Sequence, residues 1–86
     1  MTRILYTPTF VRQYQKLPAG LREEVDEKIA MFEKDPRQPS LKLHKLKGKL
    51  KGYSGFSVNY AYLIIVEEDK KDTFALLAIG DHDIYK

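Results

Sequence analysis

The sequence contains no cysteine among its 86 residues, and this absence excludes several kinds of chemistry at once. No disulfide, thiolate nucleophile or cysteine-liganded metal site can form, so nothing in the chain calls for an oxidising compartment. Long apolar runs are also lacking, because no stretch approaches the roughly 18 residues that span a membrane. The first six residues already carry a strand-like pattern rather than that of a leader. We therefore expect a cytoplasmic protein without a membrane partner.

Motifs for common cofactors and nucleophiles are missing as well. The glycines do not form the pattern of a phosphate-binding loop, and no serine lies in a nucleophile elbow. The two histidines, His44 and His82, and the nearby aspartates lack any spacing that dictates zinc or calcium coordination. We therefore expect no cofactor and no bound metal.

Acidic side chains are absent from residues 36–66, which contain six lysines or arginines. This segment carries a net charge of +6 in a chain whose total is +3, so the remainder sums to −3. Within it, lysines alternate with leucines at Lys42, Lys45, Lys47, Lys49 and Lys51. These lysines can neutralise successive phosphates, and Tyr53 offers a stacking face, so the segment favours a nucleic acid partner. The alternative is a solvated loop that keeps a small protein soluble.

Two amphipathic helices are predicted in the first half of the chain. Thr7 provides an N-cap hydroxyl and Pro8 a proline at the first helical position, so the first helix begins there. Its apolar stripe consists of Phe10, Tyr14 and Leu17, and residues 18–20 interrupt it. A second helix follows from Leu21 to about Lys34. Its apolar face holds Leu21, Val25, Ile29 and Phe32, and its polar face Glu23, Glu24, Glu27 and Lys28. The two helices should form an antiparallel hairpin.

Strand patterns occupy residues 3–7, 52–60, 61–67 and 73–79, with a polar turn at residues 68–72. Residues 62–66 are apolar in both alternating sets, so this strand should lie in the middle of the sheet. We assign Tyr6, Phe10, Phe32 and Phe74 to the core. The length suffices for one compact domain over residues 1–86. The predicted fold class is α+β: an N-terminal strand and a helical hairpin packed on a mainly antiparallel four-stranded sheet.

Histidine titrates near neutrality, so His44 or His82 can move a proton in a reaction such as the attack of an RNA 2′-hydroxyl on its own phosphate. One histidine would withdraw the hydroxyl proton, and the other histidine or Tyr85 would protonate the departing oxygen. Lysines of the basic segment would hold the phosphate. In the alternative reading, His82 only caps a turn with Asp81 or Asp83.

Several short motifs, in this order and spacing, resemble the RelE/ParE superfamily of bacterial toxins from type II toxin–antitoxin systems. They extend over nearly the whole chain: Thr7-Pro8-Thr9-Phe10, Leu17-Pro18, His44-Lys45-Leu46-Lys47-Gly48, Lys51-Gly52-Tyr53, Val58-Asn59-Tyr60 and Ile79-Gly80-Asp81-His82-Asp83-Ile84-Tyr85. The resemblance implies two helices on an antiparallel sheet and a bound antitoxin, helical and acidic enough to oppose the basic face.

The resemblance also implies an activity. RelE-like members cut messenger RNA in the ribosomal A site by the 2′-hydroxyl route without metal, whereas ParE-like members act on DNA gyrase. The element that contains His44 looks like that of the branch whose toxins use histidines. His82 with Tyr85 matches the C-terminal functional element. The resemblance thus favours an endoribonuclease with catalytic candidates His44, His82 and Tyr85. The candidate RNA and phosphate contacts are Lys42, Lys45, Lys47, Lys49, Lys51, Tyr53 and Ser57.

Two departures from the family pattern keep alternatives open. Ser57 and Ala61 replace polar residues, often arginine, that are common on the central strands of nuclease members. The tail is one residue shorter than usual between His82 and Tyr85. These differences leave open a gyrase inhibitor without catalysis, or a degenerate toxin that only binds an antitoxin and DNA.

Overall fold

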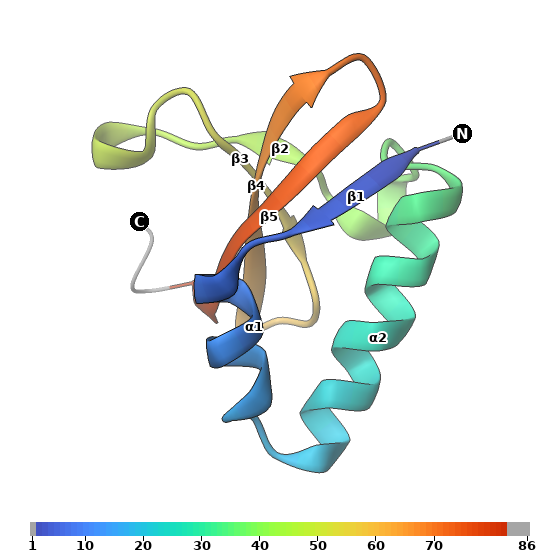
Figure 1. The fold of residues 1–86 in the computed structure, drawn as a ribbon, viewed down its shortest axis with the longest axis vertical. Helices are drawn as coiled ribbons and strands as arrows, with labels where there is room; N and C mark the ends of the chain where they lie inside the picture. Colours follow the sequence, from blue (N-terminus) through green and yellow to red (C-terminus); the bar gives the residue numbers. More distant parts are fainter. Residues whose placement is uncertain (1, 83–86) are drawn as a thin grey trace.

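The structure is a computed structural model that describes residues 2–82, and it consists of two helices against one sheet (Figure 1). Its elements are, in order, β1 (Arg3–Tyr6), α1 (Pro8–Gln15), α2 (Ala19–Lys34), β2 (His44–Lys45), β3 (Ser54–Ser57), β4 (Tyr62–Lys70) and β5 (Thr73–Asp81). Short 3₁₀ helices, η1 (Pro39–Leu41) and η2 (Gly48–Leu50), flank β2. The predicted α+β class is confirmed.

The sheet has five strands in the order β1-β5-β4-β3-β2, so the prediction of four strands was wrong. The additional strand is β2, which pairs antiparallel with β3 through His44 opposite Gly55 and Lys45 opposite Ser54. Two residues are too few to show an alternating pattern, which is why sequence periodicity missed this strand. β4 lies in the middle of the sheet, as predicted, and only β1 runs parallel to its neighbour.

Strand boundaries differ from the predicted ones on both sides of β4. The predicted strand over residues 52–60 is only Ser54–Ser57, because the chain bends at residues 58–61. β4 continues to Lys70, so the connection to β5 is a tight turn at residues 71–72. Asp72 takes the left-handed backbone conformation there, with φ of +62°, as aspartate does more readily than most residues.

The predicted cap of α1 is confirmed. The Thr7 hydroxyl oxygen accepts a hydrogen bond from the Phe10 backbone N–H at 3.2 Å, and it donates one to the Leu76 carbonyl at 2.8 Å. The second bond fixes the start of α1 on β5. α1 ends at Gln15, earlier than predicted, and α2 begins at Ala19 with Pro18 at its N-cap.

The main core lies between the helices and one face of the sheet. Phe32 stacks on Phe56 with ring centroids 4.4 Å apart, and Phe74 meets Phe32 edge-on. Phe10 is also buried, so three of the four predicted core aromatics are confirmed. Tyr6 is not one of them, since 55% of it is exposed. It belongs to edge strand β1, and its side chain lines an open hollow between α1 and α2.

A second, smaller cluster covers the opposite face of β4 and consists of Leu46, Leu63 and Ile65 with Leu50, Tyr53, Leu77 and Ala78 around them. Leu46 and Leu50 of the lysine–leucine segment thus pack on this face, Leu41 and Leu43 join the main core, and the lysines of the segment stay exposed. No helix within residues 2–82 has both the length and the apolar character needed to cross a membrane.

Candidate functional site

Both histidines line one hollow at the end of the sheet where β3 turns into β4, with a volume of about 590 Å³. We call it the histidine hollow. Its lining residues are Lys28, Ser40, Lys42, His44, Ser57, Val58, Asn59, Tyr60 and His82. The structure therefore brings together four of the predicted site residues, namely Lys42, His44, Ser57 and His82. They come from three segments of the chain, namely residues 42–44, strand β3 and the residue after β5.

His44 is held by the backbone just before it. Its Nδ1 lies 2.8 Å from the carbonyl oxygen of Lys42. Lys42 has a left-handed backbone conformation, with φ of +54°, and this bend follows η1. Because a carbonyl oxygen only accepts hydrogen bonds, Nδ1 carries the hydrogen, and the neutral ring keeps its lone pair on Nε2. An exposed imidazole with a free Nε2 is suited to accept a proton.

His82 is held by the turn between β3 and β4. Its backbone N–H donates to the Ala61 carbonyl at 2.8 Å, and its Nε2 lies 3.4 Å from the Asn59 carbonyl oxygen. By the same rule, Nε2 carries a hydrogen directed at this carbonyl. The ring is half-buried. This contact across 23 residues is a tertiary one, in contrast to the local turn cap considered from the sequence.

Asn59, which sequence reasoning did not select, organises that turn. Its side-chain oxygen accepts hydrogen bonds from the backbone N–H groups of Ala61 at 2.8 Å and Tyr62 at 2.9 Å. Its amide nitrogen donates to Glu24 of α2 at 3.0 Å. An asparagine that holds its own following backbone is typical of tight turns, and this was the signal available in the sequence. Asn59 therefore positions the carbonyl that contacts His82.

Lys28 is the second residue that sequence reasoning missed. The helical pattern assigned it to the polar face of α2, but this side chain is half-buried at the wall of the histidine hollow. With Lys42 it gives the hollow two lysines, and no Asp or Glu is among its lining residues in the described part of the chain. Such a hollow has a positive potential and attracts anions.

The remaining predicted lysines lie elsewhere. Lys45, Lys47 and Lys51 line a second hollow of about 470 Å³ together with Tyr53, which we call the lysine hollow. Lys49 belongs to η2 and is exposed, and neither hollow includes it. The lysine row predicted from sequence is therefore divided, because the chain reverses through η2 while its leucines pack on the sheet.

Tyr85 lies outside the described residues. Within residues 2–82, no group of three or more His, Asp or Glu side chains is arranged to hold a metal ion.

Comparison with solved structures shows which known proteins share this fold. No protein-family profile and no curated protein matches the sequence. Solved structures match almost the whole chain. YafQ from E. coli strain BL21(DE3) aligns with a TM-score of 0.74 at 17% identity, covering 98% of this chain and 97% of that one. A chain of the toxin–antitoxin complex RelBE2 from Mycobacterium tuberculosis aligns with a TM-score of 0.76 at 19% identity, covering 94% and 98%.

A further match is the YoeB/ParE toxin from Agrobacterium tumefaciens, with a TM-score of 0.73 at 16% identity over 94% of this chain and 99% of that one. These alignments extend over the two helices and the mainly antiparallel sheet of this chain. The chain has the fold of the RelE/ParE superfamily of toxins, and the resemblance noted in the sequence is confirmed at the level of the fold.

Proposed function

We propose that the protein is the toxin of a type II toxin–antitoxin system and that it cleaves messenger RNA on the ribosome without a metal. The proposal rests on one observation: the same hollow is lined by His44, His82, Lys28 and Lys42. Proton-transfer groups and phosphate-binding cations are the two requirements of cleavage by the 2′-hydroxyl route. The fold, shared with known toxins, supports the same assignment.

The reaction assigns a role to each group. His44 Nε2 withdraws the proton of the 2′-hydroxyl, whose oxygen attacks the adjacent phosphorus. The bond from phosphorus to the 5′-oxygen breaks, and that oxygen takes a proton from the imidazolium of His82 or from Tyr85. The products are a 2′,3′-cyclic phosphate and a 5′-hydroxyl end. Lys28 and Lys42 stabilise the charge that develops on the phosphate, though without the bidentate fork of an arginine.

The lysine hollow continues the RNA-binding surface. His44 and Lys45 of the outer strand β2 each line one of the two hollows, and both also line a hollow of about 420 Å³ together with Lys42 and Ser54. An RNA strand with its scissile phosphate at His44 meets Lys47 and Lys51 on its neighbouring phosphates. Tyr53 then serves as a stacking face for a base. Ser57 donates a hydroxyl hydrogen bond to the substrate within the histidine hollow, and Lys49 adds charge from η2.

An antitoxin is the second partner we propose. Two of the similar solved structures are toxin–antitoxin complexes, RelBE2 and the YoeB–YefM complex from Staphylococcus aureus. A disordered acidic segment that folds as a helix on the basic face would neutralise the lysines and cover both hollows.

A gyrase inhibitor is a second candidate, because Ser57 lines the hollow where nuclease members often carry arginine or histidine, and Ala61 has a methyl group where arginine or aspartate is common. Cell-free translation with a reporter message separates the two functions. We expect cut messages with wild-type protein, intact messages with His44→Ala, and normal supercoiling by gyrase. Gyrase arrest with intact messages would replace our proposal by the ParE-like function, and the absence of both activities would indicate a degenerate toxin.

A further inference from the structure

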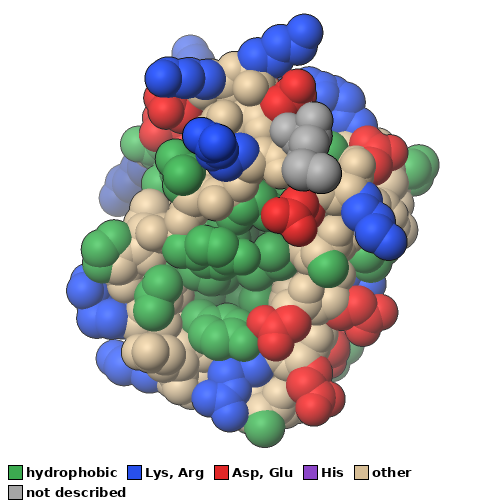
Figure 2. Space-filling model, turned by 45° about the vertical axis from the view of Figure 1, so that its right-hand side comes forward, with side chains coloured by type: hydrophobic (Ala, Val, Ile, Leu, Met, Phe, Trp, Pro, Cys, Tyr) green, Lys and Arg blue, Asp and Glu red, His purple; other side chains and the backbone are tan. Residues whose placement is uncertain are grey.

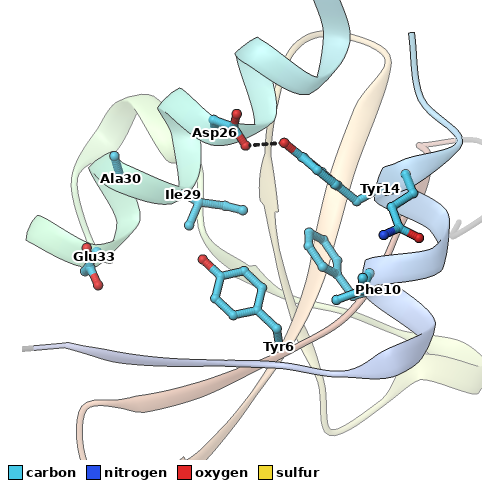
Figure 3. A pocket seen from close by; sticks show the side chains of 9 residues that line it. Tyr6, Phe10, Tyr14, Asp26, Ile29, Ala30 and Glu33 are labelled. Atoms are coloured by element: carbon cyan, nitrogen blue, oxygen red, sulfur yellow. Dashed lines mark hydrogen bonds between the residues drawn. The ribbon is translucent and has the colours of Figure 1, made fainter. Parts of the chain in front are cut away.

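Tyr60 is the most exposed large hydrophobic side chain of residues 2–82, at 97%. Two of the others, Tyr6 and Val11, line the hollow between α1 and α2. Figure 2 shows hydrophobic side chains gathered in a hollow of that face, and Figure 3 shows Tyr6 pointing toward α2. Tyr60 instead lines the histidine hollow. A single exposed aromatic is common on protein surfaces, so its place beside the two histidines is the informative feature.

The turn that carries Tyr60 is fixed on both sides of the ring. The backbone N–H of Val58 donates to the carbonyl of Tyr62 at 2.9 Å, which closes the turn. The side-chain oxygen of Asn59 accepts hydrogen bonds from the N–H groups of Ala61 and Tyr62, and its amide ties the turn to α2 at 3.0 Å. The backbone of Tyr60 is therefore set in place before any ligand binds.

The fold makes no use of the Tyr60 ring. Neither apolar cluster of the described residues includes it, and none of the ring contacts within residues 2–82 involves it. Glycine and small polar residues are the ones that tight turns favour, so the turn itself does not call for an aromatic. Tyr53 differs, because it is half-buried against the smaller cluster. The Tyr60 ring presents an open face to a ligand.

The ligand that fits beside this ring carries both negative charge and a flat unsaturated ring. Lys28 and Lys42 of the histidine hollow attract an anion, and Tyr60 lines the same hollow. An unpaired nucleotide combines a phosphate with a base, and every base has a face that stacks on an aromatic side chain. The same turn also holds His82, whose Nε2 lies 3.4 Å from the Asn59 carbonyl oxygen. A base on Tyr60 thus belongs to a nucleotide next to the phosphate at the histidines.

We propose that Tyr60 stacks on the base of a nucleotide beside the scissile phosphate and so positions that phosphate between His44 and His82. This inference rests on the function proposed above. A tyrosine has only two side-chain rotations to lose on binding, so it orders a ligand at low entropic cost. With Tyr53 in the lysine hollow, the RNA surface gains a second stacking face. Because every base can stack, the contact strengthens binding with little dependence on sequence.

The sequence contains no tryptophan, so Tyr60→Trp introduces a single fluorescent reporter at the proposed contact. The isolated variant is titrated with a short single-stranded RNA and with an abasic ribose-phosphate oligomer of the same length. The two oligomers carry the same backbone charge and differ only in the bases. We expect the RNA to quench the tryptophan emission through stacking, and the abasic oligomer to leave it unchanged.

Three further variants separate the ring from its size and its hydroxyl. Tyr60→Leu keeps an apolar side chain without a ring and should weaken binding of the RNA about tenfold, as expected for one lost stacking contact. Tyr60→Phe keeps the ring and should restore the affinity to within about twofold of wild type. The matched control is Tyr6→Leu, which removes an exposed ring outside the histidine hollow and should bind RNA like wild type.

Equal quenching by both oligomers, or quenching by neither, would overturn the proposal. So would equal affinities of Tyr60→Leu and Tyr6→Leu, or a loss in Tyr60→Phe as large as that in Tyr60→Leu. Cell-free translation distinguishes this inference from the function on which it rests. Cleavage that requires His44 but is unaffected by Tyr60→Leu would reject the stacking role alone. Quenching by RNA without cleavage of any message would support stacking and reject the endoribonuclease.

Discussion

Lys28 shows how the chemistry of one side chain depends on the fold around it. On a helical projection it is a lone cation within the acidic face of α2, a position typical of a solvated residue. In the structure the same residue closes the wall of the histidine hollow opposite segments that lie far along the chain. The role of Lys28 therefore depends on the residues that pack beside α2, and the helical periodicity of the sequence gives no information about them.

The first prediction concerns this lysine. Lys28→Ala should lower the rate of message cleavage by about tenfold to hundredfold, because one cation that stabilises the developing phosphate charge is lost. Cleavage of a reporter message in cell-free translation measures the effect. Lys34→Ala, at the exposed end of the same helix, is the control and should keep the wild-type rate. Equal rates for Lys28→Ala and Lys34→Ala would remove Lys28 from the site.

Tyr14 gives a prediction about pH. Its hydroxyl donates a hydrogen bond to Asp26, and this bond, followed by burial, raises its pKa above the ordinary value of 10.0. A raised folded-state pKa means that the contribution to stability is complete below 10.0 and is lost as the pH rises through the higher folded value. Wild type should therefore lose more stability than Tyr14→Phe between about pH 8 and about pH 11. Urea unfolding at each pH measures this, and parallel curves would contradict it.

Among the secondary-structure elements, those with a periodic pattern over several residues were predictable from the sequence, and the two-residue strand was not. Both helices, the Thr7 cap and the central place of β4 followed from periodicity and capping residues. Strand β2 did not, because its two residues are ordered by pairing with β3 and by the leucines that pack beneath the loop. Tyr6 was misassigned for a related reason: an aromatic in an edge strand is buried only if something covers that edge.

The third prediction tests how β2 is held against β3. A Cβ atom at Gly55 would lie 2.5 Å from Leu63 Cδ1 and 3.4 Å from Leu46 Cδ2, within the smaller cluster. Gly55→Ala should therefore lower the free energy of unfolding by about 1–3 kcal/mol through overpacking. The matched control is Gly20→Ala in α2, where a Cβ meets nothing within 4 Å. It should be neutral or stabilising by about 0.5 kcal/mol. If both variants keep wild-type stability, the packing of Leu46 under β3 is not as tight as described.

At the scale of the whole molecule, charge is separated between faces. The histidine and lysine hollows carry only basic charges among their described lining residues, while the hollow between α1 and α2, lined by Asp26 and Glu33, carries only acidic ones. The sequence showed the polarity as a charge count over residues 36–66. It did not show that the basic residues line two hollows or that Asp26 and Glu33 of α2 lie beside apolar side chains of α1, because both depend on how the chain packs around the sheet.

This separation yields the fourth prediction. Lys47→Ala with Lys51→Ala should weaken binding of a short single-stranded RNA and reduce the slope of log affinity against log salt by about 0.7 for each lost phosphate contact. The control is Lys70→Ala with Lys71→Ala, which removes the same charge at the turn between β4 and β5. Its salt slope should stay near the wild-type value. An equal reduction in both pairs would mean that net charge, and not the lysine hollow, governs binding.

The most direct test of the central claim is the integrity of total messenger RNA after brief induction of the protein in growing cells that contain no antitoxin. Wild type should arrest growth and leave cut messages, and His82→Ala should do neither while accumulating as folded protein to the same level. Growth arrest with intact messages would contradict the claim that the protein is an RNA-cutting toxin. Equal cleavage by wild type and His82→Ala would contradict the role given to the histidine hollow.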